Sequence, residues 1–330
     1  MGYSDCTEGI RKITRQKMGR YFKITLIVVR LFGFLLMLLS IDSCGGPHAR
    51  TDLDTTSSGT INISVDESFK PIIDSEIKVF EALYPNAKII AHYKPEADCL
   101  RDLVKDSGTR LVIVTRGLTD NEELFFKDSL KFIPSFDKVA NDAVAVIVNN
   151  QSEDSFITMN KIRALLEGSS ADKEKVIFDG SNETSTVRFA VDSILRGRPL
   201  NNDKVIGLKN SQEVIDYVSN HNDVIGLVGV SWVGNKEDTT QISFLKKVKI
   251  ASVECSACGS DIFVKPYQAN IMYKRYPLVR GLYYILKENY DGLGSGFANF
   301  LSQEKGQLIF RRAYLGPAKI DFTLREATSD

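Results

Sequence analysis

Short apolar segments alternate with segments of helical apolar spacing along most of the chain, and this alternation constrains the fold more than any other feature. Residues 110–114, RLVIV, are almost continuously apolar, as expected of a strand that is covered on both faces of a parallel sheet. The alternation predicts an α/β fold with an open sheet. The predicted strands are 61–65, 87–93, 110–114, 142–150, 175–180, 224–230, 247–253 and 261–266.

The C-terminal part of the chain is expected to be helical. Residues 277–290 and 294–315 carry apolar residues at amphipathic spacing, and this spacing predicts two long helices. The chain has 330 residues, a length that suits two domains.

Three of the predicted strands lead into loops that carry hydroxyl groups or arginine. In open α/β sheets, ligands collect at the carboxyl ends of strands, where loops meet helix N-termini. Because the three loops follow equivalent strand ends, we expect their side chains to converge on one ligand. The candidate binding residues are Ser68 and Phe69 after the first strand, Thr115 and Arg116 after residues 110–114, and Thr184, Ser185, Thr186 and Arg188 after residues 175–180.

The third loop, residues 181–189 with the sequence SNETSTVRF, leads into a predicted helix that ends at Gly197. Arg188 lies in the first turn of this helix, where a cation faces the positive end of the helix dipole. Hydroxyls, free N–H groups and an arginine at one helix start together favour a bound anion. The alternative is an ordinary capped helix whose arginine reaches a surface carboxylate.

The charge balance argues against nucleic-acid binding. Lysine and arginine together number 42, aspartate and glutamate also number 42, and the formal net charge is zero. No general positive field therefore attracts a polyanion, and a single tryptophan offers no stacking platform for single strands. Any small anion must be held by local donors.

The N-terminus reads as a targeting segment. A basic region precedes the apolar run ITLIVVRLFGFLLMLLSI, and the sequence DSCGG follows it. We expect residues 1–44 to be a signal peptide that ends at a lipidated Cys44, and residues 45–59 to be a flexible tether. Translation from Met18 would give a more typical signal peptide. The alternative is an uncleaved membrane anchor, and both readings place the rest of the chain outside the cytoplasm.

Three cysteines, Cys99, Cys255 and Cys258, follow the leader, and the last two form a lone CxxC pattern. A zinc site would need a second pair of ligands, and the three histidines show no matching spacing. We therefore expect a local disulfide or two free thiols, and neither a metal site nor a cofactor.

Several motifs in a fixed order resemble the periplasmic phosphate-binding proteins of phosphate ABC transporters, in their lipoprotein form. The similarity spans residues 58–318 and rests on RLVIVTRGL, on DGSNETSTVRF at a helix start, and on NSQEVIDYVSNHNDVIGLVGVSWV. The resemblance implies a two-lobed type 2 periplasmic-binding-protein fold with a hinge of crossing strands. It places residues 60–147 plus 263–330 in one lobe and 148–262 in the other.

The same resemblance implies the function. The chain would be a monomer in the periplasm that closes on inorganic phosphate or a related oxyanion and delivers it to an ABC transporter permease, without enzymatic chemistry. Two features depart from the family pattern. The loop lacks the middle glycine of the family motif and carries Thr184-Ser185-Thr186 instead. Thr115-Arg116 stand where many members have an aspartate that accepts a proton from phosphate. Discrimination between phosphate and sulfate is therefore open.

Two other functional classes remain as alternatives. The first is a degenerate binding-protein homologue that acts as a sensor or a surface-assembly protein. The second is an α/β hydrolase, but the sequence contains no GxSxG nucleophile motif and no HExxH helix.

Overall fold

A ten-stranded sheet forms the centre of the structure, in the order β2-β1-β3-β12-β4-β8-β6-β7, with β13 and β9 also paired to β4. The structure is a computed structural model that describes residues 54–180, 183–255 and 257–319. All of them belong to the unit Leu53–Asp330. The predicted α/β fold is confirmed.

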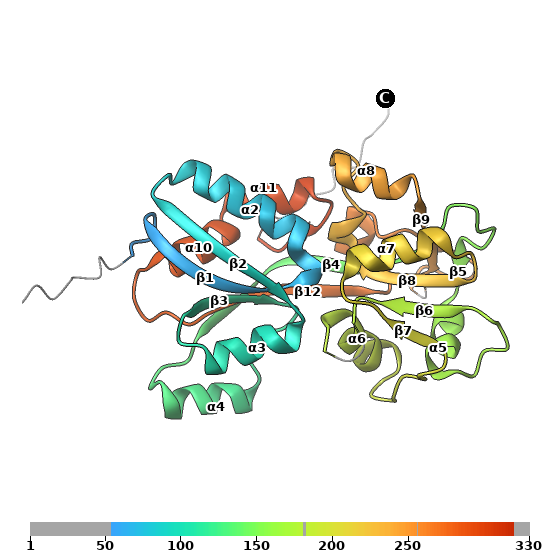
Figure 1. Cartoon of the computed structure of the whole chain (residues 1–330), viewed down its shortest axis with the longest axis horizontal. Coiled ribbons are helices and arrows are strands. Elements are labelled where there is room, and N and C mark those ends of the chain that lie inside the picture. Colours follow the sequence, from blue (N-terminus) through green and yellow to red (C-terminus); the bar gives the residue numbers. More distant parts are fainter. Residues whose placement is uncertain (1–53, 181–182, 256, 320–330) are drawn as a thin grey trace, which may run out of the picture. The chain divides into compact units, whose positions relative to one another are not determined.

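The first half of the sheet contains three of the predicted strands. β1 pairs in parallel with β2 on one side and with β3 on the other. Figure 1 shows α2 and α10 on one face of these strands and α3 and α4 on the other. The elements are β1 (Gly59–Asp66), α2 (Lys70–Leu83), β2 (Ala87–Lys94), α3 (Glu96–Lys105), β3 (Thr109–Val114) and α4 (Asp120–Ser129).

β4 (Ser135–Asn149) links the two halves of the sheet and is longer than the predicted strand 142–150. Its first part pairs with β12, and its last residues pair with β8 and β9. Figure 1 shows β4 running from one half of the fold into the other. The hinge at this strand and the boundaries of the two lobes remain predictions.

The second half repeats the arrangement of strands and covering helices. β6 pairs in parallel with β7 and β8. The predicted strand 247–253 is divided into two short strands, and the predicted strand 261–266 is shorter. The elements are β5 (Phe156–Ile157), α5 (Met159–Glu167), β6 (Lys175–Phe178), α6 (Ser185–Phe189), β7 (Val205–Gly207), α7 (Ser211–Asn220), β8 (Val224–Gly229), α8 (Thr239–Leu245), β9 (Val248–Ile250), β10 (Ser252–Glu254) and β11 (Phe263–Val264).

The prediction of a helix over residues 277–290 is wrong, because this segment contains β12 (Val279–Leu286). β12 pairs in antiparallel fashion with both β3 and β4, so its backbone is bonded on both sides. Its β-branched and aromatic residues suit a pleated surface. Pairing with two strands that are distant in sequence outweighs the local helical spacing.

The predicted helix 294–315 is two helices, α10 (Leu293–Ser302) and α11 (Glu304–Arg312). The chain turns between them at Gln303, whose backbone is extended. Gly306 permits the close approach of the second helix, since a Cβ at this position would lie 2.4 Å from the carbonyl oxygen of Phe300. The rest of the C-terminal part contains α9 (Gln268–Met272) and β13 (Gly316–Pro317).

The core of the first half is built around aromatic side chains of α2 and α10. Phe80 is fully buried, and its ring centroid lies 5.3 Å from those of Phe297 and Phe300 in edge-on contacts. Such contacts stabilise the packing beyond the area that they bury. Among the helices of the described residues, none has the length and apolar character needed to cross a membrane.

Candidate functional site

Hydroxyl groups from both halves of the sheet meet around one buried arginine. Ser68 follows β1 in a short 3-10 turn, and Ser185 and Thr186 begin α6. The Oγ atoms of Ser68 and Ser185 are 3.3 Å apart, and the guanidinium of Arg280 donates from Nη1 to Ser185 Oγ at 2.9 Å and to Thr186 Oγ1 at 3.3 Å. We call Ser68, Asp179, Ser185, Thr186 and Arg280 the polar cluster.

Arg280 comes from β12 and was not among the predicted site residues. Only 6% of it is exposed, and its Nε donates to Asp142 Oδ2 at 2.8 Å. Its Nη2 has no hydrogen-bond partner among the described residues. The guanidinium carbon lies 5.1 Å from the ring centre of Phe69, so the predicted site residue Phe69 packs against this cation.

Carboxyl groups surround the same arginine. Asp179 accepts hydrogen bonds at Oδ2 from Ser68 at 3.2 Å and from Thr186 at 3.0 Å. Burial raises the pKa of Asp179 and of Asp142 above their usual range. The pKa of Asp66 rises to about 7, chiefly through burial and then through the charge of Glu96. The carboxyl groups around Arg280 therefore take up protons more readily than exposed ones.

Arg188 lies outside the polar cluster and contacts the other half of the structure. Its Nε donates to Glu96 Oε2 at 2.6 Å, and its Nη2 donates to Glu96 Oε1 at 3.3 Å and to the hydroxyl of Thr115. Burial alone would raise the pKa of Glu96, but the hydrogen bond and the charge of Arg188 hold it below its usual value. Arg188 thus has a buried carboxylate partner in Glu96 and a surface carboxylate partner in Asp192, at 3.2 Å.

Thr115 and Arg116 are held by carboxylates as well. The backbone N–H of Thr115 donates to Glu96 at 2.8 Å. Arg116 forms a two-pronged ion pair with Glu122, at 2.7 and 2.8 Å, and this hydrogen bonding lowers the pKa of Glu122 to about 2. Arg116 and Arg188 line one cavity of about 590 Å³, but neither bonds to the hydroxyls of Ser68, Ser185 or Thr186.

Thr184 is the N-cap of α6, and its hydroxyl accepts a hydrogen bond from the N–H of Val187 at 3.4 Å. The structure thus brings Ser68, Ser185 and Thr186 together with Phe69 beside them. Arg188 donates to Thr115, and Arg116, Thr184 and Arg188 line the neighbouring cavity of about 590 Å³. The described residues contain no group of three or more potential metal ligands. Cys44 lies outside the described residues.

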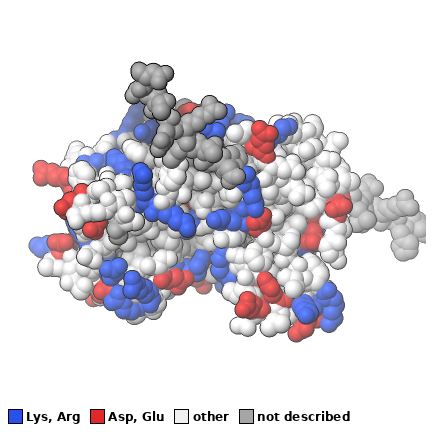
Figure 2. All heavy atoms as spheres, turned by 180° about the vertical axis from the view of Figure 1, so that it is seen from behind, with Lys and Arg blue, Asp and Glu red and all other residues white. Residues whose placement is uncertain are grey.

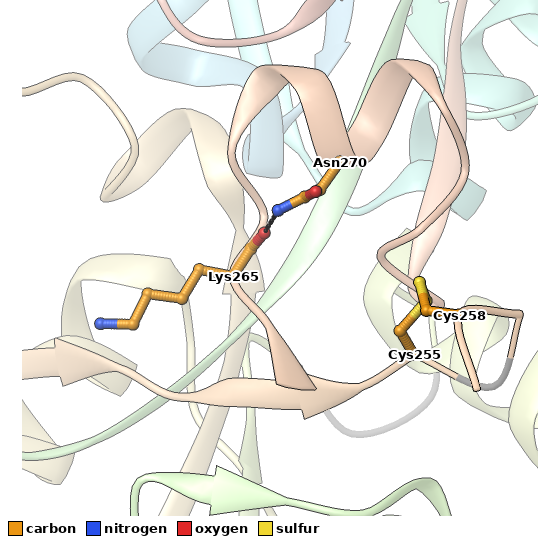
Figure 3. The surroundings of a disulfide bond; sticks show 4 residues. All are labelled: Cys255, Cys258, Lys265 and Asn270. Atoms are coloured by element: carbon orange, nitrogen blue, oxygen red, sulfur yellow. Dashed lines mark hydrogen bonds between the residues drawn. A yellow bond between two sulfur atoms is a disulfide. The ribbon is translucent and has the colours of Figure 1, made fainter. Parts of the chain in front are cut away.

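The CxxC pattern forms the local disulfide that was one of the two expected states. Figure 3 shows the bond between Cys255 and Cys258, in the segment that precedes β11. The amide of Asn270 donates to the carbonyl oxygen of Lys265 at 2.9 Å, which ties down the chain after that strand. Cys99 is a buried free cysteine.

The charged side chains on the face that Figure 2 displays are of both signs. Figure 2 shows acidic and basic side chains mixed over the face that it displays, in keeping with the formal net charge of zero. Binding of an anion would therefore depend on the contacts of a local site.

Comparison with known proteins shows the family of the chain. The family described as the PBP superfamily domain matches residues 51–304. A phosphate ABC transporter substrate-binding protein from Clostridium perfringens, solved with bound phosphate, is similar at a TM-score of 0.64 with 17% identity, over 79% of this chain and 100% of that one. A phosphate transport receptor of the ABC type from Vibrio cholerae is similar at a TM-score of 0.57 with 16% identity, over 78% and 100%.

A third structure is a regulator. The regulatory domain of CcmR from Synechocystis PCC6803 in complex with 2-PG has a TM-score of 0.50 and 13% identity, over 74% of this chain and 96% of that one. Because these identities are low, the likeness concerns the fold. No curated protein matches the chain. The family and the fold are those of binding proteins, and nothing supports the hydrolase alternative. The chain has the two-lobed type 2 binding-protein fold and belongs to the PBP superfamily.

Proposed function

We propose that this chain is an extracytoplasmic substrate-binding protein that captures phosphate, or a similar oxyanion, for an ABC importer. The supporting observation is the polar cluster, in which hydroxyls from both halves meet a buried guanidinium whose Nη2 has no partner among the described residues. Charge-assisted hydrogen bonds contribute about 1.5–3 kcal/mol each. Several of them to one oxyanion would reach the ~8 kcal/mol of a micromolar complex.

Binding would require the two halves to part and close again. The Oγ atoms of Ser68 and Ser185 are 3.3 Å apart, a separation that leaves no room for a tetrahedral anion between them. A ligand would therefore enter when the halves are apart, and closure would place the hydroxyls and Arg280 around it. We propose β4 as one of the hinge strands, since it pairs with strands of both halves.

The carboxyl group of Asp179 in the polar cluster would select an oxyanion that carries a proton. An ionised carboxylate only accepts hydrogen bonds, and Asp179 lies against the same hydroxyls that would hold the ligand. Phosphate retains a proton at neutral pH and can donate it to such a carboxylate, whereas sulfate cannot. The aspartate that is missing after β3 would thus be replaced by one after β6.

We propose that the mature chain is a monomer in the periplasm, anchored by lipid on Cys44 and partnered by a transporter permease. The support is the sequence alone, namely the basic and apolar leader and the tether of residues 45–59. Fractionation of cells that express Cys44→Ala tests the anchor. The altered chain should move from the membrane fraction to the soluble fraction, and its retention in the membrane would favour an uncleaved anchor.

Calorimetric titration of the purified protein tests the ligand. Phosphate and arsenate should bind at micromolar or lower dissociation constants, and sulfate at least tenfold more weakly. Arg280→Gln should weaken phosphate binding at least tenfold. Arg198→Gln is the matched control. Arg198 is exposed and pairs with Glu167 at 2.6 Å, and neither residue belongs to the polar cluster.

A second candidate function is a degenerate homologue that closes without a ligand. Two carboxylates of one half accept hydrogen bonds from groups of the other half that could otherwise bind an anion. Glu67 accepts hydrogen bonds from the N–H and the hydroxyl of Ser211 at the start of α7, at 3.2 and 2.7 Å, and Glu96 binds Arg188. Absence of heat with phosphate, arsenate and sulfate would favour this sensor or assembly role over transport.

A further inference from the structure

A cavity of about 750 Å³ adjoins the polar cluster. Asp66, Asp179 and Thr184 line it, and each of them also lies in the cluster or directly beside it. The lining also includes Tyr93 and Trp232. Cavities of ~300–1,000 Å³ hold small organic ligands. A single tetrahedral anion would leave most of this space to solvent.

Two residues that line the cavity, Asp66 and Asp179, carry unpaired carboxyl oxygens. Asp66 and Asp179 are 1% and 3% exposed, and Oδ2 of the first and Oδ1 of the second have no hydrogen-bond partner among the described residues. A buried acceptor without a donor is unfavourable. A ligand group that donates hydrogen bonds and carries a positive charge would relieve both carboxyl groups.

Two of the lysines that line the cavity do not meet this need. Lys70 is 2.9 Å from Asp74, and Lys94 is 2.6 Å from Asp102, so each already has a carboxylate partner away from Asp66. Glu67 adds a further carboxyl group to the lining, and burial raises its pKa to about 7. The lining also includes Lys209 and Trp232, whose Nε1 has no hydrogen-bond partner among the described residues, but neither donates to Asp66 Oδ2 or Asp179 Oδ1. These two oxygens therefore remain without a donor.

We infer that the ligand of this site is a phosphate monoester or a phosphonate whose short organic part carries a primary amine. This inference rests on the proposed function, since the phosphate group would occupy the polar cluster. The organic part extends into the cavity, and its ammonium group, with three donors, lies beside Asp66 and Asp179. Inorganic phosphate would occupy only the polar cluster and leave the cavity without a ligand group.

Calorimetric titration of the unaltered protein separates the two claims. The probes are 2-aminoethyl phosphate, ethyl phosphate, inorganic phosphate and ethanolamine. We expect 2-aminoethyl phosphate to bind at least tenfold more tightly than ethyl phosphate and inorganic phosphate. Inorganic or ethyl phosphate that binds equally tightly, or more tightly, overturns the inference and leaves the proposed function standing. Ethanolamine that binds as tightly as 2-aminoethyl phosphate also overturns it, and a lack of binding by every phosphate compound overturns both claims.

A variant locates the amine contact. In Asp66→Asn, the preference for 2-aminoethyl phosphate over ethyl phosphate should fall at least fivefold, because the carboxylate charge is lost while one acceptor oxygen remains. Asp128→Asn, on the exposed face of α4, is the matched control and should keep the preference. An unchanged preference in Asp66→Asn contradicts the placement of the amine. If that variant does not fold, the titrations of the unaltered chain decide the inference alone.

Discussion

Replacing Arg280 with methionine would remove a cation that is buried among carboxyl groups. Arg280 is 6% exposed, and its partner Asp142 is fully buried at 2.8 Å. Loss of one member of a buried ion pair costs about 3–5 kcal/mol, because the other charge is left uncompensated. Asp66 and Asp179 would lose the same counter-charge. We expect the free energy of unfolding to fall by about 3–5 kcal/mol near pH 7, out of a typical ~5–15 kcal/mol.

Urea unfolding followed by circular dichroism measures this change, with the slope of the transition expected to stay constant. The double variant Arg280→Met, Asp142→Leu removes both charges and should recover at least half of the loss. Burial raises the folded-state pKa of Asp142, so protonation stabilises the folded state, and the deficit of Arg280→Met should shrink as the pH falls from 7 to 5. A loss below about 1 kcal/mol at pH 7, or a deficit that grows on acidification, would refute the reasoning about this buried charge.

The unaltered chain should gain stability as the pH falls from about 8 to about 6. Burial raises the pKa of Asp66 and Glu67 to about 7. Over this range the folded state therefore binds protons that the unfolded state does not. A flat or falling urea midpoint over that range would contradict this. Glu96→Gln should lower the free energy of unfolding by ~1–3 kcal/mol, since it weakens the hydrogen bonds with Arg188 between the two halves; an unchanged midpoint would show that the pair contributes nothing. Cys255→Ser should cost about 2 kcal/mol through the loss of a short disulfide loop, and reduction of the unaltered chain should reproduce that loss.

Local patterns were sufficient to predict most of the sheet. Strands that are covered on both faces, such as β3 and β8, show as nearly continuous apolar segments, and their boundaries follow from the polar loops around them. The meeting of Ser68 with Ser185 was within reach for the same reason, because both lie where a strand ends and a helix begins. These predictions required only the order of the elements and no contact between distant side chains.

Arg280 could not be predicted in the same way. Its segment has apolar residues at a spacing that suits a helix, and the reason for its strand conformation is pairing with β3 and β4, which precede it by well over a hundred residues. The chemical partners of Arg188 were beyond local reach as well, since Glu96 is 92 positions away in the sequence. Such long-range ion pairs leave no periodic trace in a single sequence.

Hydroxyls of both halves and Arg280 should hold one oxyanion, and a crystal structure determined with phosphate would show whether they do. We expect phosphate oxygens within hydrogen-bond distance of Ser68, Ser185 and Nη2 of Arg280. An empty polar cluster in such crystals, or phosphate bound only between Arg116 and Arg188, would contradict it.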